Sequence, residues 1–241
     1  MIDRRTLMAA AALVPFAPAM GQEARQETWD EKWARMLRED WPWLGYYAAA
    51  NERLLASGVE TKVVFLGDSI TEGWAQKRPA FFKRGRVNRG IGGQTTAQMV
   101  LRMLQDVVQL RPHFVHIMAG TNDIAGNTGP MTVAQSIDNF RAMIMLAQAN
   151  GIEVLLASVP PASSFPWRPG LETVRPIREL NAWAKSYARQ HGLTFVDHTA
   201  ALGDDTGAMK PGMASDGVHP TEAGYDAMAG VLEPLLAARS V

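Results

Sequence analysis

Short apolar runs alternate with helical patterns along most of the chain. Large apolar and β-branched residues, bounded by turn-forming residues, predict buried strands at 63–66, 113–119, 152–159 and 193–196. Apolar residues at helical spacing predict helices at 97–110, 131–149, 173–191 and 221–238. Strands that alternate with helices in this way favour a parallel, doubly wound α/β sheet. A length of 241 residues suits one such domain and is too short for two large ones.

The first run ends abruptly at Gly67-Asp68-Ser69, which makes Ser69 a candidate nucleophile. In open α/β sheets, ligands bind at the carboxyl ends of the strands. A serine placed there, at the start of a helix, can offer its hydroxyl to a cleft and its backbone N–H to an incoming oxygen. The alternative is a plain strand-to-helix turn in which Asp68 or Ser69 caps the helix.

A glycine-rich segment, Gly-Ile-Gly-Gly-Gln-Thr, occupies residues 90–95. It lacks the third glycine of a dinucleotide fingerprint and the Gly-Lys-Ser/Thr of a phosphate-binding loop. The segment therefore favours a loop that binds an oxyanion over a nucleotide site. The helix expected after it would carry Leu101, Leu104 and Val108 on one apolar face.

Composition excludes several classes of protein. Lysine plus arginine and aspartate plus glutamate number 24 each, so no basic field is available for nucleic acid or for an anionic membrane surface. The chain has no cysteine, which rules out disulfides, a thiol nucleophile and cysteine-ligated metals. His113 and His116 would point to opposite faces of a strand, so we interpret them as structural residues and expect no metal site from them.

The amino-terminal segment is typical of an export signal. Arg4-Arg5 precedes a short apolar stretch, and Ala17-Pro18-Ala19 offers small residues for cleavage. The segment resembles a bacterial twin-arginine signal, so we expect residues 1–21 to be a signal peptide and the protein to be periplasmic or secreted, without stable membrane insertion. An uncleaved amphipathic anchor is the alternative.

The spacing of apolar residues within 22–60 predicts a helical lead-in that packs on a main domain spanning 61–241. Four tryptophans lie close together there, at positions 29, 33, 41 and 43. Core packing is the favoured interpretation of this group, and a face that stacks on sugars is the other.

A long proline-rich loop at 160–172 leaves the third predicted strand at the ligand edge. Within it, Phe165, Trp167 and Arg168 are candidates for a wall that determines substrate specificity, although an exposed surface loop is nearly as compatible with the pattern.

Acyl transfer by serine requires a nucleophile, an imidazole base, a carboxylate that orients it and donors for the oxyanion. We expect Ser69 as nucleophile, His219 as general base and Asp216, three residues earlier, as the orienting acid. The N–H groups of Ser69 and Gly93 and the side-chain amide of Asn122 would form the oxyanion hole.

Two neighbouring patterns compete with this assignment. Asp197-His198 is a rival acid–base pair, and it ranks behind because it lies nearer the last strand than the terminal helix. Asp123 follows Asn122 but suits the cap of a turn equally well, so it is left out of the catalytic set.

Four sequence blocks now point to a family. The segments 67–69, 88–93, 120–123 and 216–220 resemble, in order, the four blocks of the SGNH or GDSL-type hydrolases. The resemblance implies a flavodoxin-like three-layer α/β/α sandwich with a parallel five-stranded sheet, and ester hydrolysis without metal or cofactor. The second and third blocks look most like the branch of platelet-activating-factor acetylhydrolase and bacterial carbohydrate acetylesterases.

We therefore expect an exported serine esterase that removes a small acyl group, acetyl above all, from a carbohydrate or similar small-molecule substrate. A lysophospholipase or thioesterase of the same family is the nearest alternative. A glycan-binding module that has lost catalysis is the alternative from another class.

Overall fold

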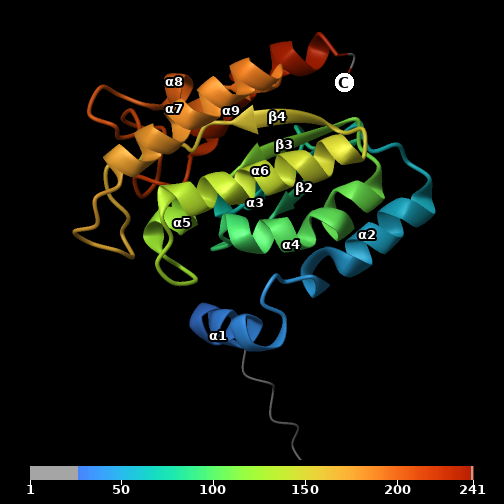
Figure 1. Ribbon diagram of the computed structural model, residues 1–241, viewed down its shortest axis with the longest axis horizontal. Helices are drawn as coiled ribbons and strands as arrows, with labels where there is room; N and C mark the ends of the chain where they lie inside the picture. The colour runs from blue at the N-terminus through green and yellow to red at the C-terminus, as the bar shows by residue number, and fades with distance from the viewer. Residues whose placement is uncertain (1–26, 240) are drawn as a thin grey trace, which may run out of the picture.

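The computed structural model describes residues 27–239 and 241, and it is a three-layer α/β/α sandwich (Figure 1). Five strands form one sheet in the order β2-β1-β3-β4-β5, and every neighbouring pair is parallel. The expected fold class is therefore confirmed. The expected signal peptide, residues 1–21, lies outside the described residues.

The strands are β1 Val63–Gly67, β2 Arg86–Gly90, β3 Phe114–Met118, β4 Glu153–Ala157 and β5 Thr194–Val196. The helices are α1 Trp29–Glu39, α2 Gly45–Ser57, α3 Ser69–Lys77, α4 Thr96–Asp106, α5 Thr121–Ala125, α6 Val133–Ala149, α7 Val174–His191, α8 His198–Leu202 and α9 Glu222–Ala237, with a short 3₁₀ turn η1 at Val108–Leu110.

Strands β1 and β3 form the centre of the core. All five residues of each strand are buried, as expected for a parallel sheet that is covered on both faces. From β1 the chain moves outward to β2 and then crosses back to β3 on the other side of β1. The topological switch point therefore lies between β1 and β3, where open α/β sheets bind ligands at the carboxyl ends of the strands.

Helices cover both faces of the sheet. Helices α4, α6 and α7 pack in sequence on one face, with α4 and α6 side by side in front of the strands in Figure 1. Helices α3 and α9 contact each other on the opposite face, where α8 also packs on α9. Within the described part of the chain, no helix is both long and apolar enough to cross a membrane.

The apolar pattern of the sequence does not predict the edge strand β2. Its first three residues are only half-buried, because an edge strand has a single neighbour in the sheet. Sequence patterns placed only a glycine-rich loop in this region. The resemblance to the family, rather than the periodicity, carried the expectation of a fifth strand.

Helix α4 buries a different face from the expected one. Leu101 and Leu104 are 56% and 54% exposed, while Met99 and Met103 are fully buried. The buried face also contains Arg102, whose charge is satisfied by partners that lie elsewhere in the sequence. A pattern of leucines alone could not reveal that partnership, so the expected apolar face was wrong.

The segment before the sheet contains two helices. Helix α2 packs along α4, and α1 lies beyond it, as Figure 1 shows in blue. Met36 of α1 and Trp43 of the linker bury themselves against Ile91, which belongs to the loop after β2. The lead-in therefore contacts the segment that leads to Gly93.

Candidate active site

A cavity of about 710 Å³ lies at the carboxyl edge of the sheet. Ser69, Gly93, Asn122 and His219 all line it. These residues follow β1, β2 and β3 or precede α9, so they come from four separate segments. Parallel strands that end at the same edge bring these segments together.

Ser69 is the first residue of α3 and directly follows the turn after β1. Asp68 caps the helix, because its Oδ1 accepts a hydrogen bond from the Ile70 N–H at 2.9 Å. Burial raises the pKa of Asp68 to about 6. The first N–H groups of a helix have no intrahelical acceptor. Ser69 therefore brings to the cavity both a hydroxyl and an N–H that its own helix leaves unbonded.

The side chains of Ser69, His219 and Asp216 form a continuous hydrogen-bonded series. Ser69 Oγ lies 2.9 Å from His219 Nε2, and His219 Nδ1 lies 2.7 Å from Asp216 Oδ2. A carboxylate can only accept a hydrogen bond, so Nδ1 carries the proton and Nε2 is left as an acceptor for the serine hydroxyl. The geometry is that of a nucleophile beside an oriented base.

A tight turn holds the acid of this series in place. Asp216 Oδ1 accepts hydrogen bonds from the N–H groups of Val218 at 2.9 Å and His219 at 2.7 Å. Partial burial of the carboxyl raises its pKa, but these bonds and the contact with the His219 side chain outweigh that effect, so the pKa of Asp216 is lowered. The carboxyl therefore stays ionised opposite the imidazole.

Asn122 is buried, and its amide is held in one orientation. Its Oδ1 accepts a hydrogen bond from Asn127 Nδ2 at 2.9 Å, and its Nδ2 donates to the Gln94 carbonyl at 3.0 Å. An amide nitrogen carries two hydrogens, and the bond to Gln94 uses one of them. Since Asn122 also lines the cavity, the second hydrogen is available to an oxygen there.

Gly93 lies in a turn that the lead-in helices help to hold. Its φ is +78°, and the Gly93 carbonyl accepts a hydrogen bond from Asn127 at 3.2 Å. The preceding N–H, that of Gly92, donates to Glu72 Oε2 at 2.9 Å. The hydroxyl of Tyr46 in α2 donates to the other oxygen of Glu72. This loop is therefore fixed from both sides.

The loop candidates divide into one buried residue and two that line the cavity. Phe165 is buried, and its ring stacks on Trp167 with centroids 5.2 Å apart. Trp167 and Arg168 line the cavity, and Arg168 Nε donates to the Ala125 carbonyl at 2.6 Å. Phe165 thus supports Trp167 from behind and does not itself border the cavity.

With this geometry in view, the comparison with known proteins is decisive for the family. Residues 65–227 match the model of the GDSL-like lipase/acylhydrolase family. The chain belongs to this family. Its members cleave esters by hydrolysis, and the protein is such an enzyme.

Solved structures agree with the family model. A GDSL-like lipase from Bacteroides thetaiotaomicron is 40% identical, with 83% of this chain and 100% of that chain covered and a TM-score of 0.79. A protein of Bacteroides fragilis described as an acylhydrolase is 38% identical over 83% of this chain and 99% of its own, with a TM-score of 0.77.

A more distant structure shares the fold alone. A variant of a Geobacillus acetyl-xylooligosaccharide esterase is 22% identical, covers 73% of this chain and 94% of its own, and has a TM-score of 0.58. No curated protein sequence matches the chain.

Asp197 and His198, the alternative acid–base pair, make their hydrogen bonds outside the cavity of this hydrolase. Asp197 Oδ1 caps α8 through the Ala200 N–H at 3.0 Å. The ring of His198 is fully buried, and its Nε2 lies 3.1 Å from Nε2 of His116. Burial lowers the pKa of His198 to about 3. Neither Asp197 nor His198 borders the cavity.

Asp123 has a structural role in the hydrolase. Its buried carboxyl accepts hydrogen bonds from the Thr96 N–H at 3.0 Å and from the Ser136 hydroxyl at 2.9 Å. Burial raises the pKa of this carboxyl, although the same hydrogen bonds oppose the shift. Because Thr96 is the first residue of α4, Asp123 fixes that helix end beside the loop that contains Gly93.

A buried arginine connects two of the strand exits. Arg102 donates from Nε to Gln94 Oε1 at 2.6 Å and from Nη2 to the Gly67 carbonyl at 2.9 Å. Its Nη1 lies 3.2 Å from Asp106 Oδ2, and both side chains of this ion pair are fully buried. The network was not expected from the sequence. Only the pairing of Arg102 and Asp106 at helical i,i+4 spacing signals it.

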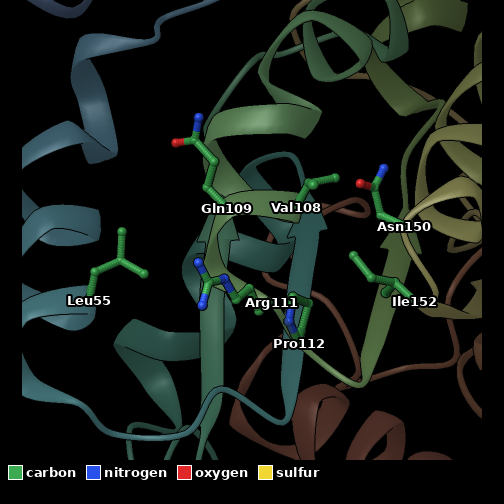
Figure 2. A pocket seen from close by; sticks show the side chains of 7 residues that line it. All are labelled: Leu55, Val108, Gln109, Arg111, Pro112, Asn150 and Ile152. Carbon is green, nitrogen blue, oxygen red and sulfur yellow. The ribbon is translucent and has the colours of Figure 1, made fainter.

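A second hollow of about 580 Å³ lies at the opposite edge of the sheet. Pro112 and Ile152, which border it, come just before β3 and β4, and Figure 2 shows them with Leu55 and Arg111 around it. It contains neither a serine nor a histidine. Elsewhere too, among the residues that the structure describes, no three histidine or acidic side chains are grouped so as to hold a metal ion.

Proposed function

We propose that the enzyme removes a small acyl group, acetyl above all, from a carbohydrate, with Ser69, His219 and Asp216 as its catalytic residues. The observation that carries the proposal is the series of contacts from Ser69 Oγ to His219 at 2.9 Å and from His219 to Asp216 at 2.7 Å. A serine ester hydrolase requires these three groups in this order.

In the first half of the reaction, Ser69 Oγ attacks the ester carbonyl while His219 Nε2 takes the serine proton. Asp216 stabilises the imidazolium that forms and keeps its ring oriented. Negative charge develops on the carbonyl oxygen, and the N–H groups of Ser69 and Gly93 and the Asn122 amide donate to it. The imidazolium then protonates the departing alcohol, which leaves an acyl-serine.

In the second half, water repeats the attack on the acyl-serine. His219 takes a proton from the water as its oxygen adds to the carbonyl, and the same donors hold the oxyanion. Collapse of this intermediate returns the proton to Ser69 Oγ and releases the carboxylic acid. The net reaction is ester plus water to acid plus alcohol, and it requires no further reactant.

The walls of the cavity support a carbohydrate substrate. Trp29, Trp33 and Trp167 border it together with the polar side chains of Asp30 and Asn127. Aromatic faces beside hydrogen-bonding groups suit sugar rings, which have both apolar C–H faces and hydroxyls. The acetyl-xylooligosaccharide esterase that shares the fold is consistent with this substrate class.

The proposal is tested with p-nitrophenyl esters of increasing chain length and with acetylated xylo-oligosaccharides. We expect hydrolysis to be confined to acyl chains of two to four carbons, acetate to be released from the oligosaccharides, and Ser69→Ala to abolish both. A maximum at eight carbons or longer would instead identify a lysophospholipase or thioesterase. Measurable glycan binding without hydrolysis of any ester would identify a non-catalytic module.

We also propose that the protein is exported, on the strength of the twin-arginine-like sequence at residues 1–21. Amino-terminal sequencing of protein recovered from its native host should begin between residues 20 and 25. Intact Met1 on that material, or recovery only from the cytoplasm, would overturn this part of the proposal.

A further inference from the structure

Helix α1 presents two tryptophans to the cavity that contains Ser69. Trp29 and Trp33 both border it, although they precede the sheet in sequence by some thirty residues or more. Trp29 remains 52% exposed, even though its ring centroid lies only 5.9 Å from Trp33 and 6.3 Å from Trp43. A large aromatic ring left half in solvent at the rim of an enzyme cavity is a surface available to a ligand.

The helix cap and neighbouring aromatic residues hold the tryptophan rings of α1 in place. Thr28 and Glu31 form a capping box at the start of the helix. Trp43, behind Trp29, is 6% exposed and stacks on Tyr46, with Lys32 Nζ 5.0 Å above the Trp43 ring. A platform that is ordered before the ligand arrives loses little conformational entropy on binding.

A further tryptophan borders the same cavity from the loop before α7. Trp167 is 39% exposed, and its centroid lies 6.1 Å from that of His219. Its other face is covered by Phe165 in a nearly parallel stack with an interplanar angle of 7°. The two groups of aromatic rings therefore border the same cavity, and both are held in place by neighbours.

Charges around the cavity favour a neutral ligand. Its charged lining residues are Asp30, Glu72 and Arg168, apart from His219. Arg168 is the one fixed cation in this lining, and its Nε already binds the Ala125 carbonyl. Both carboxylate oxygens of Glu72 already accept hydrogen bonds, one from the Gly92 N–H and one from the Tyr46 hydroxyl. The other carboxylate of the lining is that of Asp30, which is exposed. An anionic group would meet more negative than positive charge there, whereas sugar hydroxyls can donate to a carboxylate.

We propose that Trp29, Trp33 and Asp30 form a subsite for a neutral pyranose ring in the alcohol part of the ester. The inference rests on the proposed function and adds to it the place where the sugar binds. The Trp33 ring packs directly against Gly93, so the subsite begins beside the oxyanion loop. The sugar ring stacks on the tryptophans, and its hydroxyls donate to Asp30.

The first test compares kinetic constants for an acetylated xylo-oligosaccharide. Trp29→Leu keeps an apolar side chain but removes the ring, and we expect KM to rise about tenfold, or ~1.4 kcal/mol, while kcat changes little. Trp29→Tyr restores an aromatic face and should recover most of the loss. Leu101→Ala is the matched control, because Leu101 is 56% exposed on α4 and lies outside the cavity. An unchanged KM in Trp29→Leu would overturn the subsite.

The second test measures binding without turnover. In the Ser69→Ala background, xylotetraose should bind by calorimetry, and Trp29→Leu added to that background should weaken binding about tenfold. Equal affinity for xylotetraose with and without Trp29 would overturn the subsite. Binding of a lysophospholipid that is weakened as strongly as sugar binding by Trp29→Leu would also overturn it. Failure of the proposed function appears differently, as an absence of acetate release by the unmodified enzyme.

Discussion

The ring of Trp33 fills the space that a side chain at position 93 would need. A Cβ placed on Gly93 would lie 2.5 Å from Cζ3 of Trp33, well inside van der Waals contact. Helix α1 therefore closes over the loop that carries a proposed oxyanion donor. Helix α1 and this loop constrain each other, although the loop follows strand β2 and lies far from α1 in the sequence.

Gly93→Ala should therefore reduce both stability and activity. The φ of +78° costs about 1–2 kcal/mol for a residue with a Cβ, and the contact with Trp33 adds roughly 1–3 kcal/mol. We expect a lower midpoint in urea unfolding and a lower kcat on p-nitrophenyl acetate. Gly151→Ala is the control, because Gly151 has a φ of +72° but nothing within 4 Å of an added Cβ. Equal losses in the two variants would show that Trp33 does not constrain the loop.

Substitutions in the candidate active site should separate the roles by magnitude. Ser69→Ala removes the proposed nucleophile and should lower kcat on the order of 10⁴-fold or more, with His219→Ala close to it. Asn122→Ala removes one of the three proposed oxyanion donors, so we expect kcat to fall roughly 10²–10³-fold with KM little changed. Asp216→Asn should fall between these, since the imidazole loses its orienting charge but keeps its place.

The order of these effects also tests the choice of acid and base. The kinetics should be measured on purified variants whose circular dichroism matches that of the unmodified enzyme. Asp197→Asn serves as the matched control, because the Asp197 carboxylate caps α8 and does not border the cavity. If Asp216→Asn were near normal while Asp197→Asn abolished turnover, the assignment of Asp216 would be wrong.

The parts of the site that follow strands could be predicted from the sequence. Ser69 and Asn122 each come just after an apolar run, and parallel strands align such positions at one edge of the sheet. The spacing of Asp216 and His219 suits a tight turn, and the structure contains that turn. For these residues, local pattern and sheet topology together carry enough information.

The parts that depend on contacts between distant segments could not be predicted. Arg102 looks like an ordinary exposed residue of an amphipathic helix, and its burial depends on partners outside α4, the carbonyl of Gly67 and the side chain of Gln94, as well as on Asp106. Glu72 likewise accepts hydrogen bonds from the Gly92 N–H and the Tyr46 hydroxyl, and only the folded structure brings these two groups beside it. No local periodicity encodes such partnerships.

Arg102→Met should be strongly destabilising. The variant leaves Asp106 as a buried charge without its cation and removes the donor to the Gly67 carbonyl, which we expect to cost about 3–5 kcal/mol of unfolding free energy. Urea titration followed by tryptophan fluorescence measures this loss. Arg141→Ala, which breaks an exposed ion pair with Asp138, should change the free energy little. Comparable losses in the two variants would contradict a structural role for the buried pair.

The buried histidine pair should make the folded state sensitive to acid. Burial lowers the pKa of His198 to about 3, and burial, with the neighbouring His198, lowers that of His116 as well. In the unfolded chain both titrate near 6.5, so below that pH the unfolded state binds more protons and stability is lost at ~1.4 kcal/mol per pH unit for each histidine. Asp68 acts oppositely between about pH 4 and 6, because its raised pKa lets the folded state take up a proton there.

A double variant isolates the histidine contribution from that of Asp68. Replacing both partners, as His116→Phe with His198→Phe, leaves no unpaired polar group and keeps aromatic rings beside Trp74. Its unfolding free energy should fall less steeply than that of the unmodified enzyme between about pH 6.5 and pH 4.5, measured by urea titration at each pH. His113→Gln is the control, because it removes an exposed histidine that lies 3.2 Å from Glu60 and outside the buried pair, so it should change the slope less than the double variant does. Parallel slopes for the double variant and the unmodified enzyme would show that the buried pair does not remain neutral, since only neutral histidines in the folded state can produce the difference.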